Sequence, residues 1–228
     1  MTQKKRITEE KWEQLLNEQV VSDKDLNRLV MNYLVTEGFK EAAEEFQKET
    51  GTLPEVDLEE LSSRREIRQS INEGNIQKSV ELINELDPEL FDNNPNLYFH
   101  LQKQKLIELI KSGNQQIALE FAQELGQLCE GNEELLNELD EVMALFTFDK
   151  LDNSPLSFLV DNSQRQSVSR EVNSSILSTQ KQEDESKIEQ ILKTLFYCQE
   201  ELDKKIKFPK LTKENLPTGN LVFSEEKK

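Results

Sequence analysis

The chain has 228 residues, of which 35% are hydrophobic and 7% are aromatic, so it can fill the core of one or two domains. Its formal net charge of −17 argues against a broad phosphate-binding surface, because nucleic-acid affinity depends on clustered Lys and Arg that release counterions. We therefore expect neither nucleic acid nor an anionic membrane as a partner.

The two cysteines, Cys129 and Cys198, lie far apart and have no CxxC or Cys/His neighbours. The sequence therefore predicts neither a zinc site nor a disulfide framework, and buried thiols in a reducing compartment fit best. The N-terminus, Met1 to Arg6, is charged, and no apolar run is long enough for a signal peptide or a membrane span. We expect a soluble, intracellular protein.

Helix-forming residues dominate the chain. Only seven glycines and six prolines interrupt segments rich in Leu, Glu, Lys and Gln, which lose little rotamer freedom in helices. Strand-like alternation of Val, Ile and Thr is absent over any useful length. The sequence predicts an all-α fold.

The N-terminal part predicts three short helices. A leading helix is expected within residues 1–24, beginning after Thr8. A second begins after Ser22 and ends at Gly38, and a third follows and stops at Gly51. The second and third helices form a hairpin too small to bury both apolar faces, so we expect it to need a partner or a second copy of itself.

The central part predicts a longer series of helices separated by glycine and proline. These helices are expected to end at Gly74, Asp87-Pro88, Gly113, Gly131 and Phe146. Ile71-Asn72-Glu73-Gly74-Asn75 is echoed by Ile110-Lys111-Ser112-Gly113-Asn114, at an offset of 113 − 74 = 39 residues. Hairpins at this spacing stack in solenoids, but two copies fit a plain helical bundle equally well.

The last third contains two expected helices around a polar segment. Val168, Val172 and Ile176 mark the first helix. Residues 178–186 are polar throughout and predict a disordered surface loop. The helix from Ile188 to Ile206 has a long apolar stripe, which we expect to pack back onto the central helices because its exposure would favour aggregation.

No catalytic constellation is visible. His100 is the only histidine, so a Ser-His-Asp triad, a His pair or a His-rich metal site cannot be built elsewhere. His100 itself lies in a helix without a defined chemical task, so we expect it to have a structural or solvent-tipped role. The phosphate-binding patterns GxxxxGK and GxGxxG are missing, and a RING-type ladder of Cys and His is absent. The sequence predicts no enzyme activity and no cofactor.

A stretch from Leu26 to Ala43 resembles a LisH motif. The shared pattern is a leucine, then Tyr33-Leu34, then Gly38-Phe39, then a pair of small residues with Glu41. Residues from about 60 to 118, including Ile67-Arg68 and Gly74, resemble the CTLH module that follows LisH.

The C-terminal part resembles the CRA module. Its matching segments include Leu145 to Phe148, Ser154-Pro155 and Gln164 to Gln166. The segment Leu195 to Thr212 is similar to the end of the small scaffold subunits of the CTLH (GID) ubiquitin ligase complex. The implied organisation is a leading helix (1–24), LisH (25–57), CTLH (60–120), CRA (121–209) and an irregular tail (210–228), that is, a LisH hairpin before an α-helical CTLH-CRA bundle.

This resemblance implies a non-catalytic scaffold for ubiquitin-dependent proteasomal degradation. The implied partners are a RanBPM-like subunit, an armadillo-repeat subunit and a RING heterodimer, and homo- or heterodimerisation through LisH and CTLH-CRA is also implied. The implied location is cytoplasm and nucleus. The residues expected to bind other chains are Leu26, Leu29, Tyr33, Leu34, Phe39, Phe46, Leu195, Phe196 and Leu202.

Two other readings compete with this one. A LisH-dimerised adaptor of cytoskeletal or transcriptional machinery shares the N-terminal motif but does not need the CRA-like segment. An acidic histone chaperone needs a contiguous acidic tract, whereas the acids here are interleaved with Lys and apolar residues.

Overall fold

The chain folds almost entirely into helices, which confirms the all-α prediction. The structure is a computed structural model that describes residues 5–148, 150–219 and 221. The helices are α1 (Glu9–Asn17), α2 (Asp23–Thr36), α3 (Lys40–Thr50), α4 (Leu61–Asn72), α5 (Ile76–Leu86), α6 (Leu90–Asn93), α7 (Pro95–Lys111), α8 (Gln115–Leu128), α9 (Glu133–Met143), α10 (Ser157–Val160), α11 (Asn162–Thr179) and α12 (Lys187–Asp203). Short 3-10 turns are η1 (Leu58–Glu60), η2 (Ala144–Thr147) and η3 (Leu151–Asn153).

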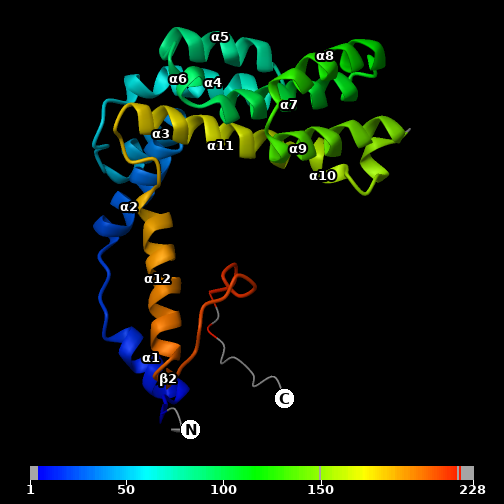
Figure 1. Ribbon diagram of the computed structural model, residues 1–228. Coiled ribbons are helices and arrows are strands. Elements are labelled where there is room, and N and C mark those ends of the chain that lie inside the picture. The colour runs from blue at the N-terminus through cyan, green and yellow to red at the C-terminus, as the bar shows by residue number, and fades with distance from the viewer. Residues whose placement is uncertain (1–4, 149, 220, 222–228) are drawn as a thin grey trace.

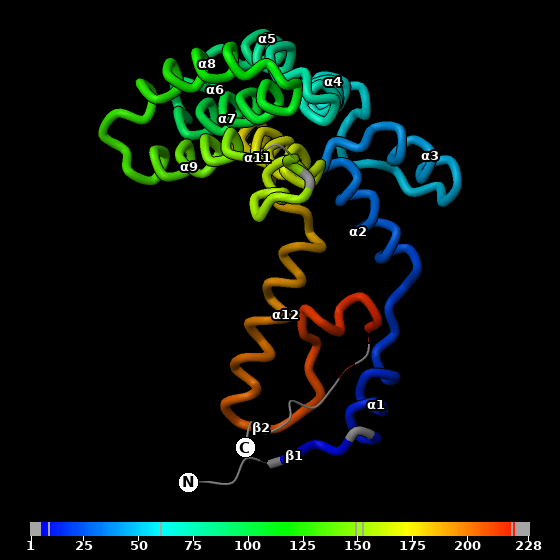
Figure 2. The backbone as a smooth tube through the Cα atoms, turned by 90° about the vertical axis from the view of Figure 1, so that its right-hand side faces the viewer, coloured from blue at the N-terminus to red at the C-terminus, as the bar shows by residue number. Residues whose placement is uncertain are grey.

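The helices form two parts that run in different directions (Figure 1). Helices α4 to α11 make an elongated bundle, which we call the arm. Helix α12 leaves one end of the arm and, with α1 and the C-terminal segment, makes a narrower part, which we call the stalk (Figures 1 and 2). The α2–α3 hairpin lies where the arm and the stalk meet.

The two similar glycine turns connect the hairpins α4–α5 and α7–α8. Gly74 has a φ of +80° and Gly113 a φ of +77°, the left-handed conformation that glycine adopts without a steric penalty. Helix α11 returns along both α4 and α7 and so closes the array. The arm is therefore a closed bundle rather than an open solenoid.

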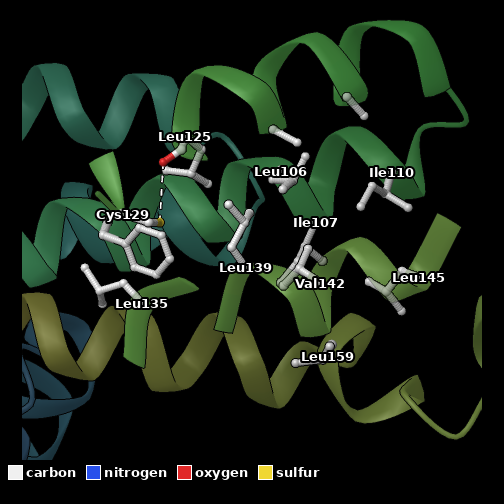
Figure 3. Packing of buried hydrophobic residues seen from close by; sticks show 13 residues of the cluster. Leu106, Ile107, Ile110, Leu125, Cys129, Leu135, Leu139, Val142, Leu145 and Leu159 are labelled. Atoms are coloured by element: carbon white, nitrogen blue, oxygen red, sulfur yellow. Dashed lines mark hydrogen bonds between the residues drawn. The ribbon is translucent and has the colours of Figure 1, made fainter. Parts of the chain in front are cut away.

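Two hydrophobic clusters fill the arm. The proximal cluster, next to the stalk, joins α4, α5, α7 and α11 and includes Ile71, Ile83 and Val172. The distal cluster joins α7, α8, α9 and α10 (Figure 3) and includes Ile107 and Leu139. Since α7 contributes side chains to both clusters, it is the central helix of the arm.

The prediction that the helix from Ile188 to Ile206 packs onto the central helices is wrong. Helix α12 packs mainly against α2 and β2 and projects away from the arm (Figure 2). Gln199 is its only buried residue, and Ile191 is 51% exposed. The apolar stripe was correctly located, but periodicity shows only that a face needs cover, not which surface covers it.

Two further expectations need correction. The predicted disordered loop at 178–186 is shorter, since Ser178 and Thr179 belong to α11 and Ser186 is fully buried as the N-cap of α12. The expectation that both thiols are buried holds for Cys129 but fails for Cys198, which is exposed on α12.

The far end of the stalk joins the two ends of the chain. Strands β1 (Lys5–Arg6) and β2 (Ile206–Lys207) pair in parallel, with Lys5 opposite Ile206; they are the only strand pair among the described residues. The rings of Trp12 and Phe208 lie 5.1 Å apart. The Gln199 side-chain amide donates to the Leu211 carbonyl and accepts from the Leu211 backbone N–H, so the chain after β2 returns along α12 (Figure 2). Residues 220 and 222–228 of the predicted tail lie outside the described part.

Candidate protein-interaction surface

The C-terminal end of α2 is fixed to the arm by a buried arginine. Arg64 of α4 donates to the carbonyl oxygens of Thr36 (3.1 Å) and Val35 (3.1 Å), and to Asn173 Oδ1 of α11 (2.8 Å). Asn173 donates in turn to the Thr36 carbonyl at 2.8 Å. Burial lowers the pKa of Arg64, but the negative end of the α2 dipole still favours a cation there.

A second arginine supports the turn between α2 and α3. The guanidinium of Arg68 lies 3.6 Å from the centre of the Phe39 ring, which is a cation–π contact. The centre of the Phe39 ring lies 6.2 Å from that of the Tyr33 ring, so the three side chains form one cluster. These contacts anchor the hairpin to α4 from inside the molecule.

The start of α12 is fixed to α2. Ser186 accepts a hydrogen bond from the backbone of Glu189, and the Glu189 carboxylate accepts one from the Ser186 backbone, which completes a capping box. The backbone N–H of Lys187 donates to Asn32 Oδ1 of α2 at 2.8 Å. Because its first turn is held at Asn32, α12 must leave the arm beside α2.

An apolar face lies between α2 and α12. Leu26, Leu29 and Val30 share one side of α2, and Ile191 and Leu195 lie on α12; we call these five residues the stalk face. Leu29, Ile191, Leu195 and Cys198 line one hollow. Leu26 is 48% exposed and Leu195 38% exposed, so the face is open to solvent. A face of this kind can bind an apolar helix of another chain.

The structure divides the nine predicted interaction residues among different places. Leu26, Leu29 and Leu195 lie in the stalk face, and exposed Leu202 lies on the last turn of α12. Tyr33, Leu34, Phe39 and Phe46 are half-buried in the hairpin, while Phe196 faces the α11 side of α12. A role in binding other chains stays a prediction for all nine residues.

Several residues of this region could not be predicted from the sequence. Val30 and Ile191 were not among the nine predicted residues, although both are exposed beside them. Asn32, Arg64 and Asn173 received no role, because polar residues within helices carry no pattern that marks them as buried partners. Their contacts join residues that lie up to 155 positions apart in the sequence.

The arm behind this face is braced by ionic contacts between helices. Arg165 of α11 donates to Glu108 of α7 (Nε to Oε1, 2.8 Å) and to the carbonyl of Asn72 at the end of α4 (3.0 Å). His100 Nδ1 lies 2.7 Å from the Glu171 carboxylate, and this hydrogen bond raises the pKa of His100. His100 therefore has the structural role expected for it.

Neither a metal cluster nor a membrane-spanning helix is found among the described residues. Across 5–148, 150–219 and 221, His, Cys, Asp and Glu side chains do not gather in a group that could hold a metal ion. None of the helices in that same part is long and apolar enough to cross a membrane.

Two protein families match this chain. The family described as "CTLH/CRA C-terminal to LisH motif domain" matches residues 60–203, and the LisH family matches residues 24–50. "Protein GID8 homolog" of Arabidopsis thaliana is 45% identical over 226 residues, covering 99% of this chain and 92% of that protein. The chain belongs to the GID8 family of LisH–CTLH/CRA proteins.

Other members of the GID8 family match over similar lengths. "Glucose-induced degradation protein 8 homolog" of Dictyostelium discoideum is 48% identical, with 95% of each chain covered. "GID complex subunit 8" of Schizosaccharomyces pombe is 32% identical over 84% of this chain and 85% of that protein. The resemblance to LisH–CTLH–CRA scaffold subunits is confirmed. The α2 residues of the stalk face belong to the matched LisH segment, and its α12 residues belong to the end of the matched CTLH/CRA segment.

Proposed function

We propose that this chain is a non-catalytic scaffold subunit of a GID-type ubiquitin ligase complex, and that its stalk face binds a helical face of another subunit. The observation that carries the proposal is the open apolar side of α2 and α12. Helix α2 is anchored to the arm through Arg64 and α12 is anchored to α2 through Asn32, so the two helices present this side in a fixed orientation.

The names of the relatives supply the context. One relative is named as a subunit of the GID complex, and two are named for glucose-induced degradation. The single histidine, His100, bonds the Glu171 carboxylate between two helices of the arm, which fits a structural role in a subunit that assembles other proteins. The partners we propose are RanBPM-like, armadillo-repeat and RING subunits, with the complex in cytoplasm and nucleus.

Affinity purification of the tagged chain, followed by mass spectrometry, tests the proposal. We expect RING-bearing and armadillo-repeat proteins to be recovered together. Recovery of cytoskeletal motors or transcription factors in their place would support the LisH-dimerised adaptor and contradict the scaffold. Fluorescent tagging of the chain at its natural level tests its location.

A further inference from the structure

The α8–α9 hairpin, at the opposite end of the arm from the stalk, has an extreme charge composition (Figure 1). Residues 112–148 contain no Lys, Arg or His. The same segment contains eight acidic residues: Glu120, Glu124, Glu130, Glu133, Glu134, Glu138, Asp140 and Glu141. This segment therefore carries −8 of the formal net charge of −17, whereas α4, α7 and α12 each contain both acidic and basic residues.

Most of these carboxylates have no cation beside them. Glu138 pairs with Lys103 and lies near His100, both on α7. The other seven side chains are exposed, and none of them lies within 4 Å of a basic nitrogen in the described part of the chain. Their negative charges are left for solvent or for a partner.

Helix α8 presents large apolar residues in line with two of these carboxylates. Ile117, Glu120, Glu124 and Leu128 follow spacings of three, four and four residues, so they share one side of the helix. Ala118, Ala122 and Leu125 are buried on another side, in the distal cluster (Figure 3). Ile117 is 49% exposed and Leu128 52% exposed. We call these four residues the α8 stripe; its length is about 16 Å at 1.5 Å per residue.

A cation already lies at the border of the α8 stripe. The ammonium group of Lys105, on α7, is 4.9 Å from the centre of the half-buried Phe121 ring. Lys105 also donates to Gln77 of α5, so this amine is held on the α5 side of α8. The carboxylates of Glu120 and Glu124 are not among its contacts and remain open to cations from outside.

We propose that the α8 stripe docks a basic amphipathic helix of a partner protein. The helix would carry two apolar residues about three turns apart, which contact Ile117 and Leu128, with Lys or Arg between them facing Glu120 and Glu124. Burial of the two apolar ends supplies affinity, and the opposite charges fix register and speed association. The α8 stripe is separate from the stalk face, so an experiment can contradict one binding proposal without contradicting the other.

A designed peptide tests the proposal directly. The probe is a fluorescein-labelled alanine-based helix with two leucines eleven residues apart and lysines between them on the same side, matching the spacing from Ile117 to Leu128. Anisotropy titration with the full chain should show binding that weakens as NaCl is raised. Both E120K/E124K and Ile117→Ser with Leu128→Ser should weaken it at least about tenfold, a loss that corresponds to about 1.4 kcal/mol.

The matched control is E45K/E49K, which makes the same charge change at the same spacing on exposed positions of α3, where the arm meets the stalk. It should change the affinity less than about twofold, since rim charges distant from the contact act only weakly. The proposal would be overturned if the control lost as much peptide affinity as E120K/E124K. It would also be overturned if a peptide with its lysines on the side opposite its leucines bound as tightly as the designed peptide. Salt-sensitive self-association of the chain that E120K/E124K abolishes would also overturn it, because the occupant would then be a second copy.

Discussion

At the scale of single residues, Gly74 and Gly113 allow backbone strain to be distinguished from side-chain crowding at a tight helix turn. Both have positive φ, where an added Cβ strains the backbone. A Cβ on Gly74 would also lie 2.8 Å from Arg165 Nη2 and 3.2 Å from Glu108 Oε2, whereas one on Gly113 would meet nothing within 4 Å. Gly74 therefore allows the approach of the Arg165–Glu108 pair that braces the arm.

We predict that Gly113→Ala lowers the free energy of unfolding by about 1–2 kcal/mol, through backbone strain alone. Gly74→Ala should lower it further, because the substitution displaces the Arg165 guanidinium from Glu108. Urea unfolding followed by circular dichroism measures both variants. Equal losses would show that the Arg165 contact contributes nothing to stability.

His100 makes the stability of the arm depend on pH. Its folded-state pKa is raised above the ordinary 6.5, first by the hydrogen bond to Glu171; burial and Lys103 oppose this shift, and the charge of Glu138 supports it. A group with a raised folded-state pKa contributes stability that is fully present below its unfolded pKa. That contribution is lost as the pH rises through the folded value.

We predict that the wild-type protein has a higher melting temperature than His100→Gln. The difference in melting temperature should be largest at about pH 6 and should become smaller toward about pH 9. The cause is loss of the charge that bridges α7 to Glu171 on α11. Thermal unfolding of both proteins across this range measures the gap. A gap that stays constant with pH would mean that His100 contributes by packing only.

At the scale of elements, the sequence allowed the helices to be located but not the direction of α12. Glycine, proline and Asn or Ser caps mark the ends of helices, so α2, α4, α5 and α7 lie where they were expected. The path of α12 is fixed by contacts distant in sequence, such as the hydrogen bond from Lys187 to Asn32, 155 positions away, and the ion pair of Lys187 with Glu55. Local periodicity cannot encode a contact of that range.

The same limit applies to the interaction residues. An apolar stripe is the same pattern whether this chain or another one covers it. The resemblance to LisH pointed to α2, and the structure adds that Leu26 and Leu29 remain accessible beside Leu195. Half-buried Tyr33 and Phe39 have partners within the chain, which the motif alone could not reveal.

We predict that Leu26→Asp with Leu195→Asp abolishes binding to the partner subunits while the helix content stays unchanged. Both side chains are partly exposed and neither belongs to the arm clusters, so the arm should fold normally. Phe158→Asp, which changes an exposed apolar residue on α10, is the matched control. Co-purification measures partner binding and circular dichroism measures helix content. If the double variant still binds its partners, the stalk face is not part of the interface.

At the scale of the whole molecule, the arm keeps two surfaces apart. The stalk face lies at one end of the bundle and the α8 stripe at the other (Figure 1). Helix α7 runs between both clusters, and α11 is tied to it through Arg165–Glu108 and His100–Glu171. A braced bundle with separate contacts at its two ends suits a subunit that holds other proteins at fixed positions.

The native size of the ligase assembly tests the scaffold function most directly. In cells that lack this chain, we predict that the RING subunits leave the large assembly on size-exclusion chromatography, because their link to the scaffold is lost. Wild-type chain and Phe158→Asp should restore the large assembly, whereas Leu26→Asp with Leu195→Asp should not. RING subunits that elute at full size without this chain would contradict the account.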